Sequence, residues 1–529
     1  MDFCQRWKDA SAELADRVTL VELCWVNTTA HLRTIHNLHP VLNDEIRRIL
    51  DASLAVLARK LDLAVIQVQK LQDPRSDARP GFLHFRIRAE GAKYALYQST
   101  LDAAIRDLEE WQGRCKTTLD LNMRDPNPAI DQMLQKLRET ETQEKQQSGP
   151  GAASTKGHKP TTSMASPVSL TGGIRDALQP TGTQPSVFLP TMPLSTSAIP
   201  FSRAKAACMQ SSSNKNRWFI LDTLSCRPQT DVRALNDDVR DLARKLKHAD
   251  PFAFGLLNCK GVMRVFGSPP QLDLAGFDLV FNVPEGTDAT QMKSLRGLLL
   301  GREGGGAPSL SRRVRLAQEL ATSVSYVHTF NFVHKNICPE SVLLFEWEGT
   351  SQLGRSSIVT TNRRSSFLIG FESFRSAGGK TSLMGDQDWE HNIYRHPERM
   401  GEFPAEEYRM QHDIYSLGVC LLEIGLWEPL VEYAGDEADP TPEYGRVCRE
   451  FVETENPWVL FKDYLVGLAQ NELPRRMGDK YAELVLTCLT CLDKGGNFGD
   501  QGEVADADGI LVGVRFIETI FGQLNEIVL

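Results

Sequence analysis

The sequence lacks the features that mark membrane-spanning, secreted and zinc-binding proteins. Its 529 residues contain no run of about 18 apolar residues that could cross a bilayer. The opening stretch MDFCQRWKD is charged from its second residue, so we expect no signal peptide. The cysteines are scattered, and the closest pair, Cys488 and Cys491, has no second pair to complete a zinc site. We therefore expect reduced thiols in a cytoplasmic protein.

The chain also lacks an excess of positive charge. Its formal net charge is −9 at pH 7, which argues against a broad nucleic-acid-binding surface, so we expect no nucleic-acid partner. A composition of 41% hydrophobic and 24% charged residues is typical of globular proteins with sizeable cores. At this length, domain statistics predict roughly two to four domains. Composition divides the chain into three parts, at 1–147, 148–214 and 215–529.

Residues 1–147 have the apolar spacing of long helices that pack side by side. A first helix is expected over 5–36, with Trp25 among its inward residues. Pro128 suits the first turn of a last helix, and we expect a four-helix bundle. Between these helices, steps of four and three residues predict two core seams: Leu50, Leu54, Leu57, Leu61, Ala64, Val68 and Leu71, and then Tyr97, Leu101, Ala104, Leu108, Trp111 and Cys115.

Residues 148–214 are rich in Ser, Thr, Pro and Gly. They hold too little contiguous apolar surface to offset the entropy lost on ordering the chain, so we expect a disordered linker. The stretch TGGIRDALQPTG offers glycines, but no strand precedes them, so we do not expect a phosphate-binding loop there.

Residues 215–529 alternate between strand and helix patterns. Apolar runs predict three short strands, at 217–224, 254–267 and 277–283. A helix is expected between the first two strands, at 238–248. A long amphipathic helix is expected over 309–332. It leads into FVHKNICPESVLLF, residues 332–345, the most informative stretch of the sequence.

This stretch keeps the frame of a protein kinase catalytic loop, H-R-D-L-x-x-x-N. Further landmarks follow in kinase order: GFE at 370–372 where kinases have DFG, PE at 397–398 from APE, and the segment QHDIYSLGVCLLEIGLW. We therefore expect 215–529 to resemble a protein kinase, as a two-lobed α+β fold. The matched architectural positions are His334, Pro339, Phe371, Pro397, Glu398, Asp413 and Gly418.

The resemblance also implies which positions would carry the chemistry, and these have changed. Asn336 stands in place of the carboxylate that would accept the substrate proton, and Cys338 replaces the lysine that would contact phosphate. Ser341 and Gly370 replace the metal-binding asparagine and aspartate. The strand at 217–224 has no lysine, and no glycine-rich loop precedes it. We expect a pseudokinase without catalytic residues, metal or cofactor; weak, metal-independent ATP binding is the remaining option.

The segment between Gly370 and Pro397 matches a kinase activation loop in position and length. It carries four hydroxyl residues near basic side chains, and a phosphate there could order the loop through arginine contacts. The alternative is that these are ordinary loop residues. The candidate regulatory positions are Ser373, Ser376, Thr381 and Ser382.

The order of helical region, low-complexity segment and degenerate kinase-like domain resembles a family of filamentous-fungal proteins. Their N-terminal region is related to the HeLo and het-s cell-death and incompatibility domains, and this part of the resemblance rests on helical layout and the stretch LVELCW. The layout is also similar to the mixed-lineage kinase-domain-like effector of animal necroptosis. The resemblance implies a signalling pseudokinase that contacts and controls its own bundle, with protein partners.

Alternatives remain open at this point. The protein could be a weakly active Ser/Thr kinase that uses Glu372 or Glu340 as its carboxylate, or a scaffold that does not switch. Relatives that permeabilise membranes begin with an apolar stretch, whereas this chain begins MDFCQRWKD. We expect a cytoplasmic protein, with peripheral membrane contact on activation left open. The basic group Arg75, Arg79, Arg86 and Arg88 is either a solvated loop or a contact for anionic lipid or a partner.

Overall fold

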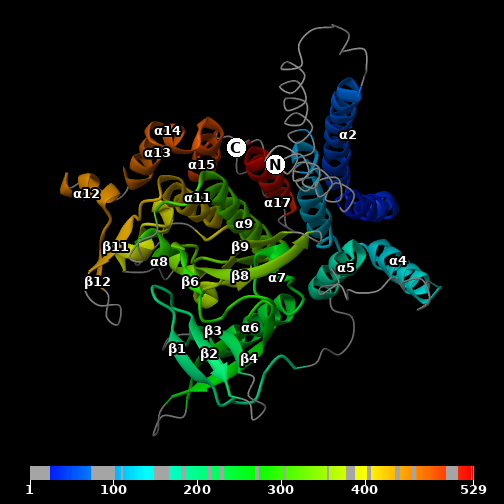
Figure 1. Cartoon of the computed structure of the whole chain (residues 1–529). Helices are drawn as coiled ribbons and strands as arrows, with labels where there is room; N and C mark the ends of the chain where they lie inside the picture. Colours follow the sequence, from blue (N-terminus) through cyan, green and yellow to red (C-terminus); the bar gives the residue numbers. More distant parts are fainter. Residues whose placement is uncertain are drawn as a thin grey trace, which may run out of the picture. The chain divides into compact units, whose positions relative to one another are not determined.

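The computed structural model divides the chain into two compact units (Figure 1). One comprises Met1–Gly172 with Ser351–Val359, and the other Gly173–Thr350 with Thr360–Leu529. Among the described residues, no helix is long and apolar enough to cross a membrane. The structure describes residues 24–72, 100, 102–105, 107–108, 111–147, 166–179, 186–210, 216–226, 231–267, 273–301, 306–353, 357–376, 388–401, 407–434, 441–454, 460–495, 498, 510–525 and 527.

The first unit is helical over its longer described stretches. Helices run over residues 24–38 and 111–122, over α2, Asp44–Gln72, and over α4, Pro128–Gln147. A short 3-10 helix, His39–Val41, precedes α2. Pro128 begins α4, as predicted, because the first turn of a helix does not need the N–H that proline lacks.

The predicted seams of this unit are confirmed in part. Leu50, Leu57, Leu108, Trp111 and Cys115 are all buried. The prediction that Trp25 faces inward is wrong, since 47% of its surface is exposed. The first 19 residues predicted for the opening helix, 5–23, and the basic group at 75–88 lie outside the described residues.

The predicted linker is wrong in its second half. Residues 167–178 form α5, Pro167–Leu178, which contains the glycine pair of TGGIRDALQPTG, and 186–210 contain two strands. These are β1, Ser195–Ala198, and β2, Lys205–Met209, and β2 pairs along its length with β3, Arg217–Ser225. The run of Ala206, Ala207 and Cys208 is too short to fold alone, but it is buried against strands that come later in the chain. Residues 148–165, 180–185 and 211–215 lie outside the described part.

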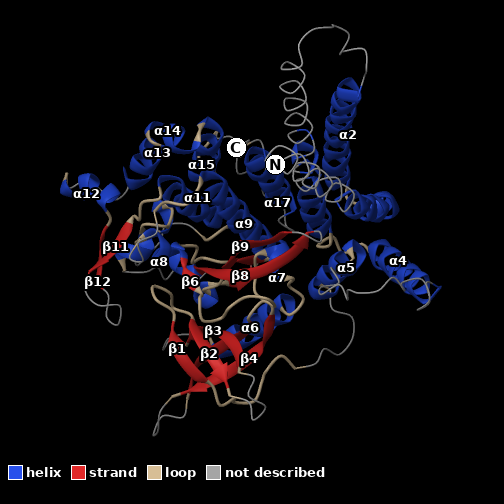
Figure 2. Ribbon diagram, viewed as in Figure 1, coloured by secondary structure: helices blue, strands red, loops and turns tan. Residues whose placement is uncertain are grey.

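The second unit begins with a five-stranded antiparallel sheet in the order β1-β2-β3-β5-β4 (Figure 2). The strands β3, β4, Cys259–Phe266, and β5, Leu274–Asn282, confirm the strand predictions at these places. Between β3 and β4 lie α6, Val232–Leu246, and the short α7, Pro251–Phe254. A core cluster on the sheet joins Ala207, Phe219, Leu221, Met263 and Val280.

Side-chain caps fix where several helices of this unit begin. The Asp231 carboxylate accepts the N–H groups of the first turn of α6, and Asp250 does the same for α7. Ser294 and Ser309 cap α8, Leu295–Leu299, and α9, Leu310–Thr329. The predicted long helix at 309–332 is therefore confirmed as α9, with its end three residues earlier.

Most of the remaining helices lie at the other end of this unit from the five-stranded sheet, where the helix α11, Met410–Leu426, is buried throughout (Figure 2). They are α12, Arg446–Glu453; α13, Phe461–Asn471; α14, Leu473–Met477; α15, Asp479–Leu489; α17, Ile510–Phe516; a π-helix, Ile517–Phe521; and α18, Gly522–Asn525. A two-stranded ribbon, β11, Val431–Ala434, and β12, Thr441–Tyr444, follows α11.

A small three-stranded sheet has the order β6-β8-β9, from Lys293–Ser294, Val342–Leu353 and Ser357–Leu368. It includes most of residues 346–366, a stretch between the two matched motifs whose composition is typical of a surface loop but which forms strands here. The strands β8 and β9 connect residues 334–341 to residues 370–376. The chain runs out along β8 and back along β9, so these two stretches lie close together.

Candidate functional site

The predicted catalytic-loop positions and the GFE stretch lie side by side. They are aligned by β7, Phe332–Val333, and β10, Arg375–Ser376, which pair antiparallel with Val333 opposite Arg375. Asn336 Nδ2 then donates to Gly370 O at 3.3 Å and to Glu372 Oε1 at 3.2 Å. The structure therefore brings together residues from both predicted motifs.

Gly370 has no room for a side chain. Its φ is 85°, in the left-handed region. An added Cβ would lie 2.9 Å from the Ser341 Cβ and 3.2 Å from Asn336 Nδ2. An aspartate at this position would thus require both neighbours to move.

Asp413, at the start of α11, anchors the beginning of the loop. Its buried carboxylate accepts the backbone N–H groups of His334 and Lys335, at 2.8 and 2.9 Å, and the hydroxyl of Tyr408 at 2.7 Å. It also lies 3.1 Å from His328 Nε2. Burial acts to raise the pKa of Asp413, but the hydrogen bonds with His328 and Tyr408 and the electrostatic effect of the nearby imidazoles outweigh it, so the pKa is lowered and the carboxylate stays ionised. These bonds hold Lys335 at a φ of 67°.

His334 packs against Phe371. Their ring centroids are 4.8 Å apart and both side chains are buried. Burial lowers the pKa of His334 to about 4, so the imidazole is neutral at pH 7. The Phe371 ring also lies 6.3 Å from Phe281 at the end of β5, which connects the loop to the sheet.

Asp222 is a site residue that the sequence analysis missed. It lies in β3, is buried, and its Oδ2 accepts the backbone N–H groups of Gly370 and Phe371 at 2.9 and 2.8 Å. Burial raises its pKa to about 6, against the effect of these hydrogen bonds and with a smaller contribution from Glu372. A single acid inside the apolar run RWFILDTL was the available signal, since a buried carboxylate requires specific partners.

Cys338 and Ser341 form hydrogen bonds with each other, within the turn that contains them. Cys338 precedes the 3-10 helix Pro339–Ser341, and Ser341 is its last residue. Ser341 Oγ donates to Cys338 O at 2.8 Å and accepts the Cys338 N–H at 3.2 Å. Burial raises the pKa of the Cys338 thiol, which is therefore uncharged.

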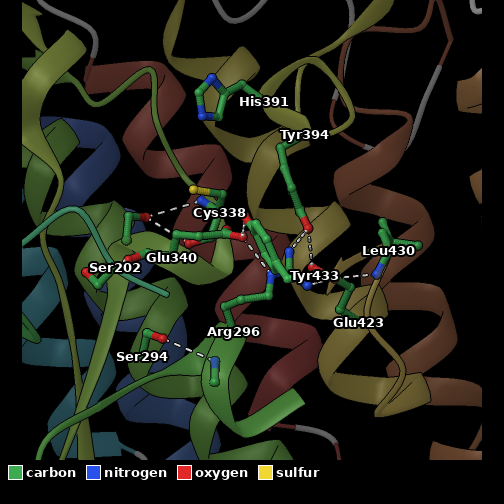
Figure 3. Close-up of polar contacts among 12 residues, drawn as sticks. Ser202, Ser294, Arg296, Cys338, Glu340, His391, Tyr394, Glu423, Leu430 and Tyr433 are labelled. Carbon is green, nitrogen blue, oxygen red and sulfur yellow. Dashed lines mark hydrogen bonds and ion pairs between the residues drawn. The ribbon is translucent and has the colours of Figure 1, made fainter. Parts of the chain in front are cut away.

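Glu340 belongs to a buried ion network around Arg296 (Figure 3). Arg296 Nε lies 2.6 Å from Glu340 Oε1, and its Nη1 lies 2.9 Å from Glu423 Oε1 in α11. Tyr394 bonds to Arg296 and also donates to Glu423 at 3.0 Å, while Tyr433 donates to Glu340 at 3.1 Å. Against the effect of burial, the Arg296 charge lowers the pKa of Glu340, so this carboxylate is an ionised structural partner.

The predicted regulatory positions are only partly described. Ser373 lies in the 3-10 helix Phe371–Ser373, and Ser376 pairs with Phe332 in the β7–β10 ribbon. Thr381 and Ser382 lie outside the described residues. Between Ser373 and Ser376, the side chain of Arg375 is buried and donates a hydrogen bond to the Tyr408 carbonyl.

Lys335 lies in a positive environment beside this segment. Its pKa is lowered to about 8, first by burial and then by the charges of Arg375, Arg399 and Arg395. The predicted Pro397 and Glu398 open the 3-10 helix Pro397–Arg399, which supplies one of these arginines. This part of the chain therefore concentrates cationic groups.

Two histidines near Glu398, together with Glu398 itself, are residue types that can bind a metal ion, but the hydrogen bonds of the histidines do not favour metal binding. Ligand atoms of His396, Glu398 and His412 lie within 4.8 Å of one another. The Nδ1 atoms of both histidines accept backbone N–H groups, from Glu398 and Arg409. In the neutral rings the proton then sits on Nε2, which removes that lone pair from metal binding.

No model of a known protein family and no curated protein matches the sequence.

Proposed function

We propose that the second unit is a two-lobed protein kinase-like module that has lost phosphoryl transfer and acts as a switch or docking surface for the N-terminal helices. One observation carries the proposal. Segments that match kinase landmarks, from β3 to α11, meet around Gly370–Phe371, while the groups at that point are an amide, a glycine and a buried acid. The antiparallel sheet with α6, followed by a mostly helical part, supports the same comparison.

The site chemistry argues against phosphoryl transfer. Transfer needs a carboxylate near the acceptor hydroxyl and oxygen ligands for Mg²⁺. The Asn336 amide cannot accept a proton, Gly370 offers no ligand, and the Ser341 hydroxyl is used within its turn. Asp222 adds negative charge near the place where phosphates would have to bind. Since one electrostatic group is worth ~3–4 kcal/mol in an active site, the combined loss leaves no practical rate.

A direct test is transfer of radiolabelled phosphate from ATP to the protein itself and to a generic substrate. We expect none, and we expect no Mg²⁺-dependent rise in melting temperature with ATP. Transfer by the wild type that disappears in an Asn336→Ala variant would contradict the proposal.

A weakly active kinase remains the second candidate because Glu372 Oε1 lies 3.2 Å from Asn336 Nδ2. Glu372 is paired with Arg203, as Glu340 is with Arg296, but only Glu372 lies next to Asn336 and could replace the missing base. The Glu372→Gln variant separates the two functions. If the protein is a weak kinase that uses Glu372, the variant should lose phosphate transfer. If the protein is a switch without catalysis, wild type and variant should incorporate equally little phosphate.

The switch function itself is distinguished from a passive scaffold by the segment between Gly370 and Pro397. We propose that phosphate at Thr381 or Ser382 is received by the cationic groups around Lys335, whose pKa is lowered first by burial and then by the charges of these neighbouring arginines. The test compares wild type, T381E/S382E and T381A/S382A for protease cleavage within 148–165 and for crosslinks to the first unit. Identical patterns in all forms would favour the scaffold.

A role in fungal cell death or incompatibility is proposed from the resemblance of the layout alone. It predicts that residues 1–147, expressed without the kinase-like module, reduce the viability of a fungal host, whereas the whole chain does not. Equal viability with both would remove this role and leave the switch proposal intact.

A further inference from the structure

The turn between β1 and β2, residues 199–204, is fastened to the helical part of its unit. The two strands pair up to Ala198 and Lys205, so the turn is the tip of a hairpin. The Pro200 carbonyl accepts the hydroxyl of Ser294 at 2.8 Å, and the Ser202 hydroxyl donates to the Glu340 carbonyl at 3.0 Å. Ser202, Ser294 and Glu340 are drawn in Figure 3. The tip of the sheet thereby contacts α8 and the loop at 334–341.

Phe201 shows that these contacts hold the turn in a fixed conformation. Its φ is 53°, in the left-handed region that a residue with a side chain rarely adopts. Its ring lies 5.3 Å from the ring of Tyr433, which in turn donates to Glu340. A strained backbone of this kind persists only when surrounding contacts over-determine it.

Within this turn, Arg203 contacts residues that are far away in the sequence. Its Nη1 lies 2.5 Å from Glu372 Oε1, and its Nη2 lies 2.5 Å from His391 Nε2. A guanidinium only donates hydrogen bonds, so both partners accept. Glu372 precedes residues 377–387, and His391, in α10, Trp389–Asn392, follows them. Arg203 therefore holds the residues on both sides of the predicted regulatory positions Thr381 and Ser382.

We propose that the 199–204 turn is a latch and that Arg203 is its releasable contact. The Ser294 anchor is fully buried, whereas the Arg203 side chain is 53% exposed. Movement of Glu372 or His391 removes an acceptor of Arg203 and loosens the turn, so the hairpin responds to the positions of these two residues. The inference rests on the proposed function only where it assigns regulation to Thr381 and Ser382.

The test is hydrogen–deuterium exchange of the whole chain in wild type, Arg203→Gln and Lys205→Gln. Lys205 is exposed, lies two residues away in the same hairpin and loses the same charge, so it is the matched control. Reporter amides are those of Ser202, bonded to Ile199 O, and of Phe374, bonded to Phe371 O. We expect R203Q to exchange about two- to fivefold faster in both 199–204 and 370–376, the range for a partly exposed ion pair. K205Q should match wild type.

The Glu372→Gln variant weakens the Arg203–Glu372 contact by changing the other partner. It keeps the test valid if R203Q loses stability. It should accelerate exchange in 199–204, and the double variant should exchange no faster than R203Q alone, since the Glu372 contact is already lost in R203Q. Wild-type rates in 199–204 for both single variants would overturn the latch. Faster exchange confined to 199–204 in R203Q would overturn the coupling to 372–391. Phosphate transfer is not read by this measurement, so failure of the proposed function is detected separately.

Discussion

Two backbone N–H groups bind the Asp222 carboxylate, yet burial raises its pKa from 3.8 to about 6. The folded state therefore binds this proton more tightly than the unfolded state does. The resulting stability is fully present below about pH 4 and is lost as the pH rises through about 6. A difference of about two pKa units corresponds to about 3 kcal/mol over the whole window.

The Asp222→Asn variant should abolish this pH dependence. The amide oxygen can still accept the N–H groups of Gly370 and Phe371, and it carries no charge to desolvate. From pH 5 to pH 7.5, the free energy of unfolding of wild type should fall relative to D222N by about 1–2 kcal/mol, measured by denaturant titration. Asp237→Asn, at an exposed position of α6, is the control. Parallel pH curves for wild type and D222N would contradict the prediction.

A second residue-scale prediction concerns Gly370. Alanine at Gly370 and at Gly301 should both lose ~1–2 kcal/mol, because each glycine has a positive φ. At Gly301 an added Cβ meets nothing within 4 Å, whereas at Gly370 it meets the Ser341 Cβ at 2.9 Å. Gly370→Ala should therefore be less stable than Gly301→Ala by a further ~1–3 kcal/mol in denaturant titration. Equal losses would show that the Gly370 neighbours relax freely.

At the scale of elements, the close approach of α11 and α15 depends on Gly418. An added Cβ would lie 2.7 Å from the Cys488 Cβ and 3.1 Å from the Leu489 backbone nitrogen. Gly418→Ala should thus destabilise the fold by ~1–3 kcal/mol, because the two helices must separate. Gly467→Ala, in α13 with nothing within 4 Å of the added Cβ, should instead gain up to ~1 kcal/mol from helix propensity. The same sign for both variants in thermal unfolding would refute this account.

The Arg296 network joins α8, the turn at Pro339–Ser341 and α11. Arg296→Met should lose ~3–5 kcal/mol, since it leaves the Glu340 and Glu423 carboxylates without their shared cation. Adding Glu423→Gln should recover part of the loss, because one of the two charges is then removed. Arg240→Met, which breaks an exposed ion pair with Asp237, should change stability by less than ~1 kcal/mol in the same titration. Comparable losses in R296M and R240M would count against the network.

At the scale of the whole molecule, the start of the sheet-containing unit can be tested by truncation. A fragment of residues 186–529 keeps β1 and β2, whereas 215–529 removes them and leaves the β3 edge unpaired. An unpaired central strand exposes backbone groups and apolar side chains to other chains. We expect 186–529 to unfold cooperatively in circular dichroism and 215–529 to aggregate. A soluble, cooperatively folding 215–529 would restore the boundary predicted from composition.

Local patterns predicted much of the secondary structure, because the information lies within a few turns or strands of chain. The buried seam residues Leu50, Leu57 and Cys115 follow from helical periodicity. The start of α4 at Pro128 follows from the chemistry of its first turn, and α9 from its amphipathic pattern. The adjacency of Asn336 and Gly370 was anticipated only through the resemblance to kinase motifs.

Only the tertiary structure showed that 186–210 belongs to the sheet, that Asp222 binds the turn at Gly370, and that Arg203 reaches Glu372. The physical reason is separation along the chain: Asp222 is 148 residues from Gly370, and Arg203 is 169 residues from Glu372. A weakly apolar strand such as β2 gains its stability from partners that composition within its own window does not reveal. Local sequence determined segments such as α4 and α9, and the packing of distant segments determined that β2 joins the sheet and which groups Asp222 and Arg203 bind.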